Sequence, residues 1–434
     1  MNKNMGKPFI KFVMLCFGSF VAAIGSGITS FGLGVYVFEQ TGLASSSTLI
    51  ILLAFLPGLL LTPFAGVLAD KYDRRLLMIL GDGLSALGLI YILICMLNGS
   101  ALLWQIGIGV TISSVFSSLI EPAFKATITD LLTEEEYSKA SGLVQLSGSA
   151  KFLISPLVAG FLLQVSDIKL LLVIDICTIF LTVMVTFVVR KGLVAKAAEY
   201  KESFFHEFRT GLTALTQNRG VFTLVLSGIG ISFFLGCIQS LYTPMILGFT
   251  DSSVLGVSTT ISAMGMLVSS LILGMVPIKR GFTQMLFASL FLAGIFMAGY
   301  GFRENIILIC IFGFLFFSML PFANTSIDYL IRTNISNDVQ GRVWGLIGII
   351  SQLGYVIAYS ILGPLADYVF IPLLVEDGAL ANSMGKVIGV GSGRGVGLLI
   401  MIAGLLLSVT AILLYNIKSV RGLERGGELC TEKL

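Results

Sequence analysis

Apolar runs of about twenty residues recur from one end of the chain to the other, and they decide what it can fold into. A helix of that length crosses a hydrocarbon core of roughly 30 Å. The composition agrees, because 56% of the residues are hydrophobic and only 12% are charged, whereas soluble domains carry about 25% charge. The alternating pattern of a membrane β-barrel does not occur. The sequence therefore predicts an all-α polytopic membrane protein.

Hydropathy and helix breakers predict twelve transmembrane spans, and the first apolar run is too long for the core of a cleavable signal peptide. The longest polar interruption falls between the sixth and seventh spans. We therefore expect one six-helix bundle over 1–190, a cytoplasmic linker over 191–219, and a second bundle with a tail over 220–434. The predicted spans are 10–36, 46–69, 76–97, 101–130, 138–165, 169–190, 220–247, 254–277, 283–302, 305–331, 342–371 and 393–417.

Lysine and arginine predict the orientation, because they are enriched in cytoplasmic loops. With the N-terminus inside, 21 of the 27 basic residues fall on the cytoplasmic side. We therefore expect a multi-pass protein of the cell inner (plasma) membrane with both termini in the cytoplasm. The six cysteines are scattered singly, and His206 is the one histidine, so we expect no metal site and no disulfide framework. The net charge of +3 is too small and too spread out to indicate nucleic acid.

A weak internal repeat relates the two halves. A shift of 199 residues superposes Pro122 on Pro321 and Gly142 on Gly341, and transporters often build their site between duplicated six-helix units. A membrane-embedded enzyme would need a nucleophile with its base, or a metal, at membrane depth, and the one histidine lies outside the spans. The chain has no GxxxxGK[ST] loop of an ATP-driven pump. The residues favour a secondary transporter without a cofactor over an enzyme.

The turn GVLADKYDRR, residues 66–75, concentrates charge between two apolar spans. It resembles the signature loop between helices 2 and 3 of the major facilitator superfamily, although Asp73 stands where that family usually has glycine. The stretches 121–160 and 337–370 resemble the drug:proton antiporters that include macrolide-efflux proteins. The matching residues of the turn are Gly66, Leu68, Ala69, Asp70, Arg74 and Arg75.

The resemblance implies the major facilitator fold, with twelve transmembrane helices in two six-helix bundles. It also implies proton-coupled efflux of amphipathic, macrolide-like small molecules by a monomer whose partners are substrate, proton and lipid bilayer. Export or flipping of a siderophore, a peptide antibiotic or a lipid remains an alternative.

In the family's gating latch, Asp70 faces the N-terminal dipole of helix 11 at Gly341–Arg342. Arg74 or Arg75 reaches Asp130 at the foot of helix 4. The simpler alternative for this turn is retention of positive charge on the cytoplasmic side.

Ionisable residues inside spans are candidates for proton coupling or for the cavity, because burying each one costs at least ~2.5 kcal/mol. Glu121 and Lys151 are at similar distances from the tip of the hairpin between helices 4 and 5, so we expect an ion pair. That pair either holds the helices together or faces the cavity. Asp82 and Asp328 are expected near the membrane interface, and no partner can be named for Asp175. Asp175 and Asp328 complete the candidate coupling residues.

Two further positions bear on the mechanism. Relatives often carry in helix 4 an arginine linked to proton coupling, and this sequence has Ser113 instead. The helix 5 motif of antiporters occurs as SPLVAG, in which Pro156 and Gly160 would supply a kink and close helix packing. These two residues either only pack or take part in switching.

Overall fold

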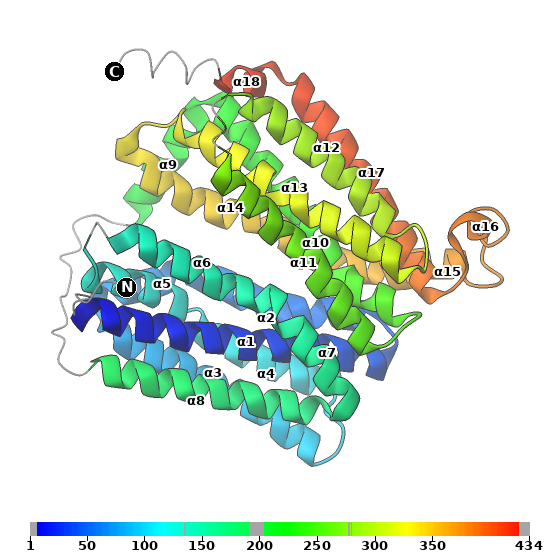
Figure 1. Cartoon of the computed structure of the whole chain (residues 1–434), viewed down its shortest axis with the longest axis horizontal. Helices are drawn as coiled ribbons and strands as arrows, with labels where there is room; N and C mark the ends of the chain where they lie inside the picture. Colours follow the sequence, from blue (N-terminus) through cyan, green and yellow to red (C-terminus); the bar gives the residue numbers. More distant parts are fainter. Residues whose placement is uncertain (1–6, 134–135, 191–203, 277, 279, 425–434) are drawn as a thin grey trace. The chain divides into compact units, whose positions relative to one another are not determined.

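The computed structural model describes the chain except for residues 1–6, 134–135, 191–203, 277, 279 and 425–434 (Figure 1). The described residues contain twelve helical spans that are long and apolar enough to cross a membrane. This confirms the all-α class and the predicted number of spans. The observed spans are Pro8–Thr41, Ala44–Lys71, Arg74–Leu97, Leu103–Leu131, Ala140–Val165, Ile168–Arg190, Arg219–Leu247, Ser252–Met275, Phe282–Tyr300, Ile306–Arg332, Val339–Leu374 and Ser392–Asn416.

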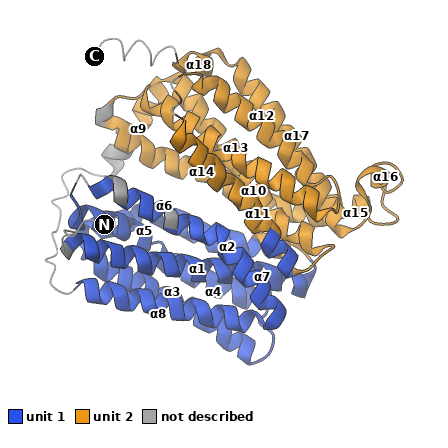
Figure 2. Ribbon diagram, in the orientation of Figure 1, with its two compact units in different colours: residues 1–42, 49–200, 252–257 blue, residues 43–48, 201–251, 258–434 orange. Residues whose placement is uncertain are grey.

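The chain forms two compact units, which Figure 2 distinguishes by colour. Unit 1 comprises residues 1–42, 49–200 and 252–257, and unit 2 comprises the rest. The first turn of the second span is therefore part of unit 2, and the first residues of the eighth span are part of unit 1. The helices that begin in the first half are α1 (Lys7–Thr41), α2 (Ala44–Lys71), α3 (Arg74–Leu97), α4 (Leu103–Ser117), α5 (Ile120–Leu131), α6 (Tyr137–Leu153), α7 (Ser155–Val165) and α8 (Ile168–Arg190).

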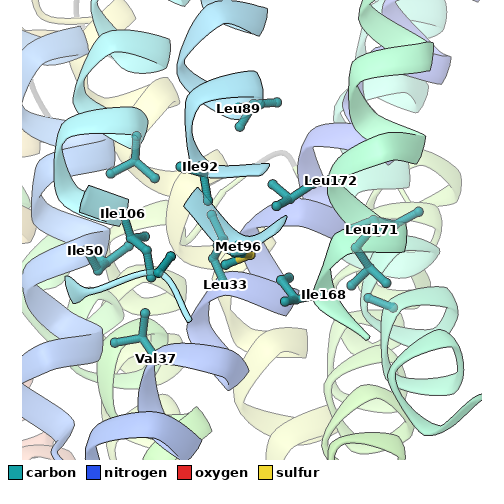
Figure 3. Packing of buried hydrophobic residues seen from close by; sticks show 14 of the residues in the cluster. Leu33, Val37, Ile50, Leu89, Ile92, Met96, Ile106, Ile168, Leu171 and Leu172 are labelled. Atoms are coloured by element: carbon teal, nitrogen blue, oxygen red, sulfur yellow. The ribbon is translucent and has the colours of Figure 1, made fainter. Parts of the chain in front are cut away.

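The core of unit 1 is a cluster of aliphatic side chains from α1, α3, α4 and α8, including Val37, Ile92, Ile106 and Leu171 (Figure 3). Each of these four side chains is fully or almost fully buried. Helices α3 and α4 approach so closely at Gly88 that an added Cβ would lie 2.8 Å from the backbone nitrogen of Ser113. Small residues permit such approach, and van der Waals packing then holds membrane helices together.

Prolines interrupt the fourth and fifth spans of unit 1. Pro122 lies where α4 gives way to α5, and Pro156 lies at the start of α7, directly after the end of α6. A proline lacks the N–H and its ring clashes with the carbonyl four residues earlier, so the helix breaks before it. Transporters place such discontinuous helices at their substrate and ion sites.

The helices of the second half pack in unit 2 around α12 and α17, where Gly294 meets the backbone of Gly404. The eleventh span is irregular, because α14 passes after Pro364 into the π-helix η2. The elements are α9 (Phe204–Gln217), α10 (Arg219–Leu247), α11 (Ser252–Met275), α12 (Phe282–Tyr300), α13 (Ile306–Arg332), α14 (Asn337–Leu365), η2 (Ala366–Phe370), α15 (Ile371–Leu374), α16 (Gly385–Ile388), α17 (Ser392–Asn416) and α18 (Lys418–Arg421).

The predicted linker contains a helix. Residues 191–203 lie outside the described part, but α9 follows and packs on α14. At Gly211 an added Cβ would lie 2.9 Å from Leu346 Cδ1 and 3.2 Å from the backbone oxygen of Arg342. Helix α9 therefore covers one side of the start of α14, the eleventh span.

A buried arginine holds the segment between α15 and α17. Arg394 is fully buried at the start of α17, and its Nη1 donates to the carbonyl oxygens of Gly301 and Ile388, each at 3.2 Å. Its Nε lies 3.0 Å from a carboxylate oxygen of Glu304. A buried guanidinium is costly unless it is paired, so these contacts tie the short helix α16 to the end of the bundle.

Candidate functional site

The turn at residues 66–75 is ordered by an ion-pair network within unit 1. Arg74 Nη1 lies 2.7 Å from Asp130 Oδ1, and Arg75 Nη2 lies 3.5 Å from the other oxygen of the same carboxylate. Arg74 also donates to the carbonyl oxygen of Ala126 at 2.9 Å. Both arginines thus contact Asp130 at the end of α5, as the sequence predicts, and they join the second turn of the chain to the fourth span.

Asp73, which stands where the family usually has glycine, has two partners. Its Oδ1 accepts from the backbone N–H of Arg75 at 3.1 Å and caps α3, and its Oδ2 lies 2.8 Å from Arg190 Nε. Burial alone would raise the pKa of Asp73, but the hydrogen bonds and charges of Arg190 and Arg75 outweigh it and lower the pKa below its usual range. The departure from the family pattern therefore creates a tether between α3 and α8, which are the third and sixth spans.

Asp70 lies at the end of α2 with 41% of its side chain exposed, 3.9 Å from Arg74 Nη2. Its predicted partners, Gly341 and Arg342, lie in the second turn of α14 in unit 2. Beside Gly66, an added Cβ would meet nothing within 4 Å among the described residues. The latch between Asp70 and helix 11 stays a prediction.

The predicted ion pair between Glu121 and Lys151 is wrong. Glu121 lies in the first turn of α5, and its Oε1 accepts from Lys125 Nζ at 2.6 Å. Both side chains are mostly exposed, at 74% and 67%. The prediction matched the depth of the two residues, but depth does not fix the direction in which a side chain leaves its helix. Exposed charges within a span are tolerated beside water rather than lipid, so Glu121 and Lys125 mark a water-facing side of helix 4.

Lys151 instead belongs to a buried cluster with Asp82 and Asp175. Lys151 lies within electrostatic range of Asp175, and Asp175 lies within that of Asp82, but no N–O distance of 4.0 Å or less joins Lys151 to Asp175. Only 4% of Asp82 and 3% of Asp175 is exposed. The three residues come from α6, α3 and α8, and we call them the Asp–Lys–Asp cluster.

Two glycines of α1 make room for this cluster. An added Cβ at Gly25 would lie 2.9 Å from Asp175 Oδ1, and one at Gly27 would lie 3.1 Å from Lys151 Cγ. The Asp175 carboxylate also lies beside the hydroxyls of Thr29 and Thr178, the latter at 3.5 Å. Helix α1 thus leaves space beside both Asp175 and Lys151.

Asp82, which the sequence predicts near the membrane interface, is buried inside unit 1, and its depth in the membrane stays a prediction. Helix α3 begins at Arg74, so Asp82 lies about two turns inside it. Its Oδ2 has no hydrogen-bond partner among the described residues. With both carboxylates ionised the cluster carries one net negative charge, and one added proton makes it neutral. Because a buried net charge is costly at low dielectric, the cluster is suited to bind and release one proton.

The remaining predicted residues lie elsewhere. Asp328 pairs with Arg332 at 2.7 Å near the end of α13, where both side chains are about half exposed, and its place at the membrane interface stays a prediction. Gly160 on α7 packs against the first residues of α11, where an added Cβ would lie 2.6 Å from the backbone oxygen of Ser252 and 3.2 Å from Gly256 Cα. Pro156 lies one turn earlier, and its carbonyl meets Gly256. These small residues allow the backbones of α7, in the fifth span, and α11, the eighth span, to touch.

Sequence reasoning missed a polar contact in unit 2. Tyr359 on α14 donates its hydroxyl to Gln239 Oε1 on α10 at 2.6 Å, and the ring of Tyr355 lies 5.9 Å from that of Tyr359. Gln239 is exposed although it lies well inside an apolar span. An exposed amide is poorly tolerated against lipid, so this side of unit 2 also faces water. A glutamine in an apolar run was the signal that could have found it.

A cavity of about 630 Å³ lies at the predicted cytoplasmic end of unit 2. Its lining includes Asn218 and Arg219 between α9 and α10, and Asn334 after α13. Asn334 Nδ2 donates to the backbone oxygen of Leu423 at 3.0 Å, which closes one side. The lining includes none of Asp82, Lys151 and Asp175, so the cavity is separate from the Asp–Lys–Asp cluster.

Comparison with known proteins gives consistent results. The family model described as Major Facilitator Superfamily matches residues 15–359. Macrolide efflux protein A of Streptococcus pyogenes is 28% identical over 367 residues, which cover 82% of this chain and 90% of that protein. Macrolide efflux protein A of Enterococcus faecalis is 27% identical over 307 residues, covering 70% and 95%. The crystal structure of the nucleoside transporter NupG has a TM-score of 0.73 at 12% identity, covering 94% of this chain and all of that one, and this likeness shows a shared fold.

Proposed function

Because the chain belongs to the major facilitator superfamily of membrane transporters, we propose that it exports amphipathic small molecules in exchange for protons. The cargo is of macrolide or similar drug-like chemistry. The membrane is the plasma membrane, with both termini in the cytoplasm. The chain works as a monomer by alternating access, and the proton gradient drives the cycle without nucleotide or cofactor.

The observation that carries the proposal is the Asp–Lys–Asp cluster. Two buried carboxylates and one lysine share a site inside the spans of unit 1, and a single proton changes the net charge of that site between minus one and zero. Proton relays in transporters are built from such intramembrane acids. Asp175 and Asp82 hold the coupling proton between them, and Lys151 keeps the second carboxylate charged.

The path of the cargo follows from the exposed polar residues inside spans. Glu121 and Lys125 mark one water-facing side, and Gln239 with Tyr355 and Tyr359 marks another. The amide of Gln239 beside the rings of Tyr359 and Tyr355 suits an amphipathic molecule that offers both hydrogen-bonding groups and an apolar body. The macrolide-efflux relatives support cargo of this class and the outward direction.

The test uses inverted membrane vesicles from an efflux-deficient host that expresses the full chain. A proton gradient imposed across these vesicles should drive accumulation of a radiolabelled macrolide, and an uncoupler should abolish it. Vesicles from the same host with an empty vector are the control. Accumulation that requires ATP and persists with an uncoupler would contradict proton coupling.

The choice of cargo is tested separately. The same vesicles are offered an amphipathic cation, a ferric siderophore, a peptide antibiotic and a fluorescent lysophospholipid. Uptake of the macrolide or the cation alone supports the proposal. Gradient-driven uptake of only the siderophore, the peptide or the lipid would keep the coupling mechanism and overturn the cargo class.

A further inference from the structure

The pentapeptide Gly-x-Leu-Ala-Asp occurs twice in the chain. The first copy, GVLAD, ends α2 at Asp70, and the second, GPLAD, leads from α14 into η2 at Asp367. Helix 2 and helix 11 cross the membrane in opposite directions, because one is an even-numbered and the other an odd-numbered span. The two copies therefore end on opposite sides of the membrane. Asp70 is on the predicted cytoplasmic side, and Asp367 is on the predicted outer side.

Asp367 binds the start of a helix. Its Oδ1 accepts from the backbone N–H of Ala44 at 2.9 Å, and its Oδ2 accepts from that of Ser45 at 2.8 Å. Ala44 and Ser45 begin α2, where backbone N–H groups have no partner within the helix. The helix dipole favours a carboxylate at this position, and the hydrogen bonds are charge-assisted. One carboxylate therefore satisfies two otherwise unpartnered donors of helix 2.

The backbone around Asp367 is shaped for this contact. At Gly363 an added Cβ would collide with Thr48 Oγ1 and would lie 2.6 Å from Ser45 Cα. Pro364 follows and removes a backbone donor, and the chain then continues as the π-helix η2 that carries Asp367. Single π-turns within helices are frequent at functional positions. The glycine and the aspartate of the motif thus both contact the first turn of α2.

The place of this contact in the fold gives it a consequence for transport. Residues 43–48 pack within unit 2, whereas α2 from residue 49 onward belongs to unit 1. Asp367 therefore holds the first turn of a helix whose remainder is built into the other bundle. If the two bundles alternate between conformations, either this contact breaks or α2 bends near residue 49.

We propose that Asp367 is a gating residue, the outer counterpart of Asp70. Its carboxylate holds the N-terminus of α2 against the eleventh span (α14 and η2) when the outer side is closed. It releases that end of α2 when the outer side opens. In the opposite state, Asp70 binds the N-terminus of α14, the start of the eleventh span. The two copies of the motif thus stabilise opposite conformations. The proposal rests on alternating access but not on the identity of the cargo or the coupling ion.

The test measures distances between spin labels in the full chain, with its native cysteines replaced, in lipid nanodiscs. The outer pair is Leu102→Cys with Phe302→Cys, and the cytoplasmic pair is Tyr72→Cys with Met275→Cys; these four positions are exposed. We expect Asp367→Asn and Asp367→Ala to raise the population with a long outer distance, by about two- to fivefold relative to the closed population. Asp70→Asn should shift the cytoplasmic pair toward its long distance instead.

Gly363→Ala is a second route to the same state, because it displaces the first turn of α2 without removing the carboxylate. It should shift the outer pair in the same direction as Asp367→Ala. Gly66→Ala is the matched control at the equivalent position of the first copy, where an added Cβ meets open space. It should leave the outer pair unchanged.

The proposal is overturned if both Asp367 variants leave the outer distances as in the wild type. It is also overturned if they shift the two pairs in the same direction as Asp70→Asn. If Asp367→Ala does not accumulate in the membrane, the isosteric Asp367→Asn and the separate Gly363→Ala still decide the question. The readout needs no cargo and no proton gradient, so a failure of the proposed export would leave this result intact.

Discussion

The Arg190 guanidinium at the end of α8 lies 2.8 Å from the Asp73 carboxylate at the start of α3, with Nε facing Oδ2. A related tether occurs in unit 2, where Glu424, after α18, accepts from the backbone N–H groups of Gly281, Phe282 and Thr283 at the start of α12. In each half, the chain at the end of the sixth span thus binds the N-terminus of the third span. In the first half Arg190 binds the start of α3, and in the second half Glu424 binds the start of α12. The turn before α12 contains no aspartate equivalent to Asp73, and Glu424 supplies the carboxylate there.

Arg190→Gln should loosen the start of α3. The pair is partly exposed, so the loss is about 1 kcal/mol or less. Hydrogen exchange of the backbone amides in the first turns of α3 should rise, whereas the start of α12 should not change. Equal protection of α3 in the variant and the wild type would show that Asp73 caps the helix without help from Arg190.

The Asp73 tether also predicts a dependence on pH. Because the folded-state pKa is lowered, the stabilisation is fully present above the unfolded pKa of about 3.9. It is lost as the pH falls through the lower, folded-state pKa. Stability of purified protein should therefore fall more steeply with acid in the wild type than in Arg190→Gln. Parallel acid curves would contradict the assignment.

Glu424 should stabilise α12 in the same way. Backbone hydrogen bonds from Thr283, Gly281 and Phe282 outweigh the effect of burial and lower the pKa of Glu424. Glu424→Ala removes the cap and should cost about 0.5–2 kcal/mol, visible as a lower melting temperature in detergent. Glu424→Gln, which keeps an acceptor oxygen, is the control and should cost less. A chain ending at Leu423 should behave like Glu424→Ala.

Hydropathy predicted the spans, and the resemblance of the turn to the family's signature loop predicted the contact of Arg74 or Arg75 with Asp130. Hydropathy is a local property, and a short turn between two helices leaves its side chains few places to reach. The partner of Lys151 could not be predicted, because depth along the membrane leaves the rotation of each helix open. The breaks before Pro122 and Pro156 add a further change of direction. Lys151 and Asp175 lie beside two glycines of α1, Gly27 and Gly25, and this packing is not visible in the hydropathy of the sequence.

Lys151→Met should destabilise the protein, because it removes the cation near two buried carboxylates. Breaking a directly paired buried ion pair costs on the order of 3–5 kcal/mol, and the loss here should be smaller because Lys151 and Asp175 are not in direct contact. Expression and melting temperature should both fall. Lys151→Met combined with Asp175→Asn removes opposite charges together and should recover much of both. Glu121→Gln is the matched control, since its side chain is exposed and pairs only with Lys125 among its described neighbours. A Lys151→Met protein as stable as the wild type would contradict the cluster.

The most direct test of proton coupling compares two activities of Asp175→Asn in proteoliposomes. The first is accumulation of a radiolabelled macrolide against its gradient, driven by an imposed proton gradient. The second is exchange of labelled for unlabelled macrolide without any gradient. We predict that Asp175→Asn loses accumulation and keeps exchange, because the bundles still alternate but the coupling proton has no site. Accumulation at the wild-type level in Asp175→Asn and in Asp82→Asn would contradict the assignment of the coupling proton to this cluster.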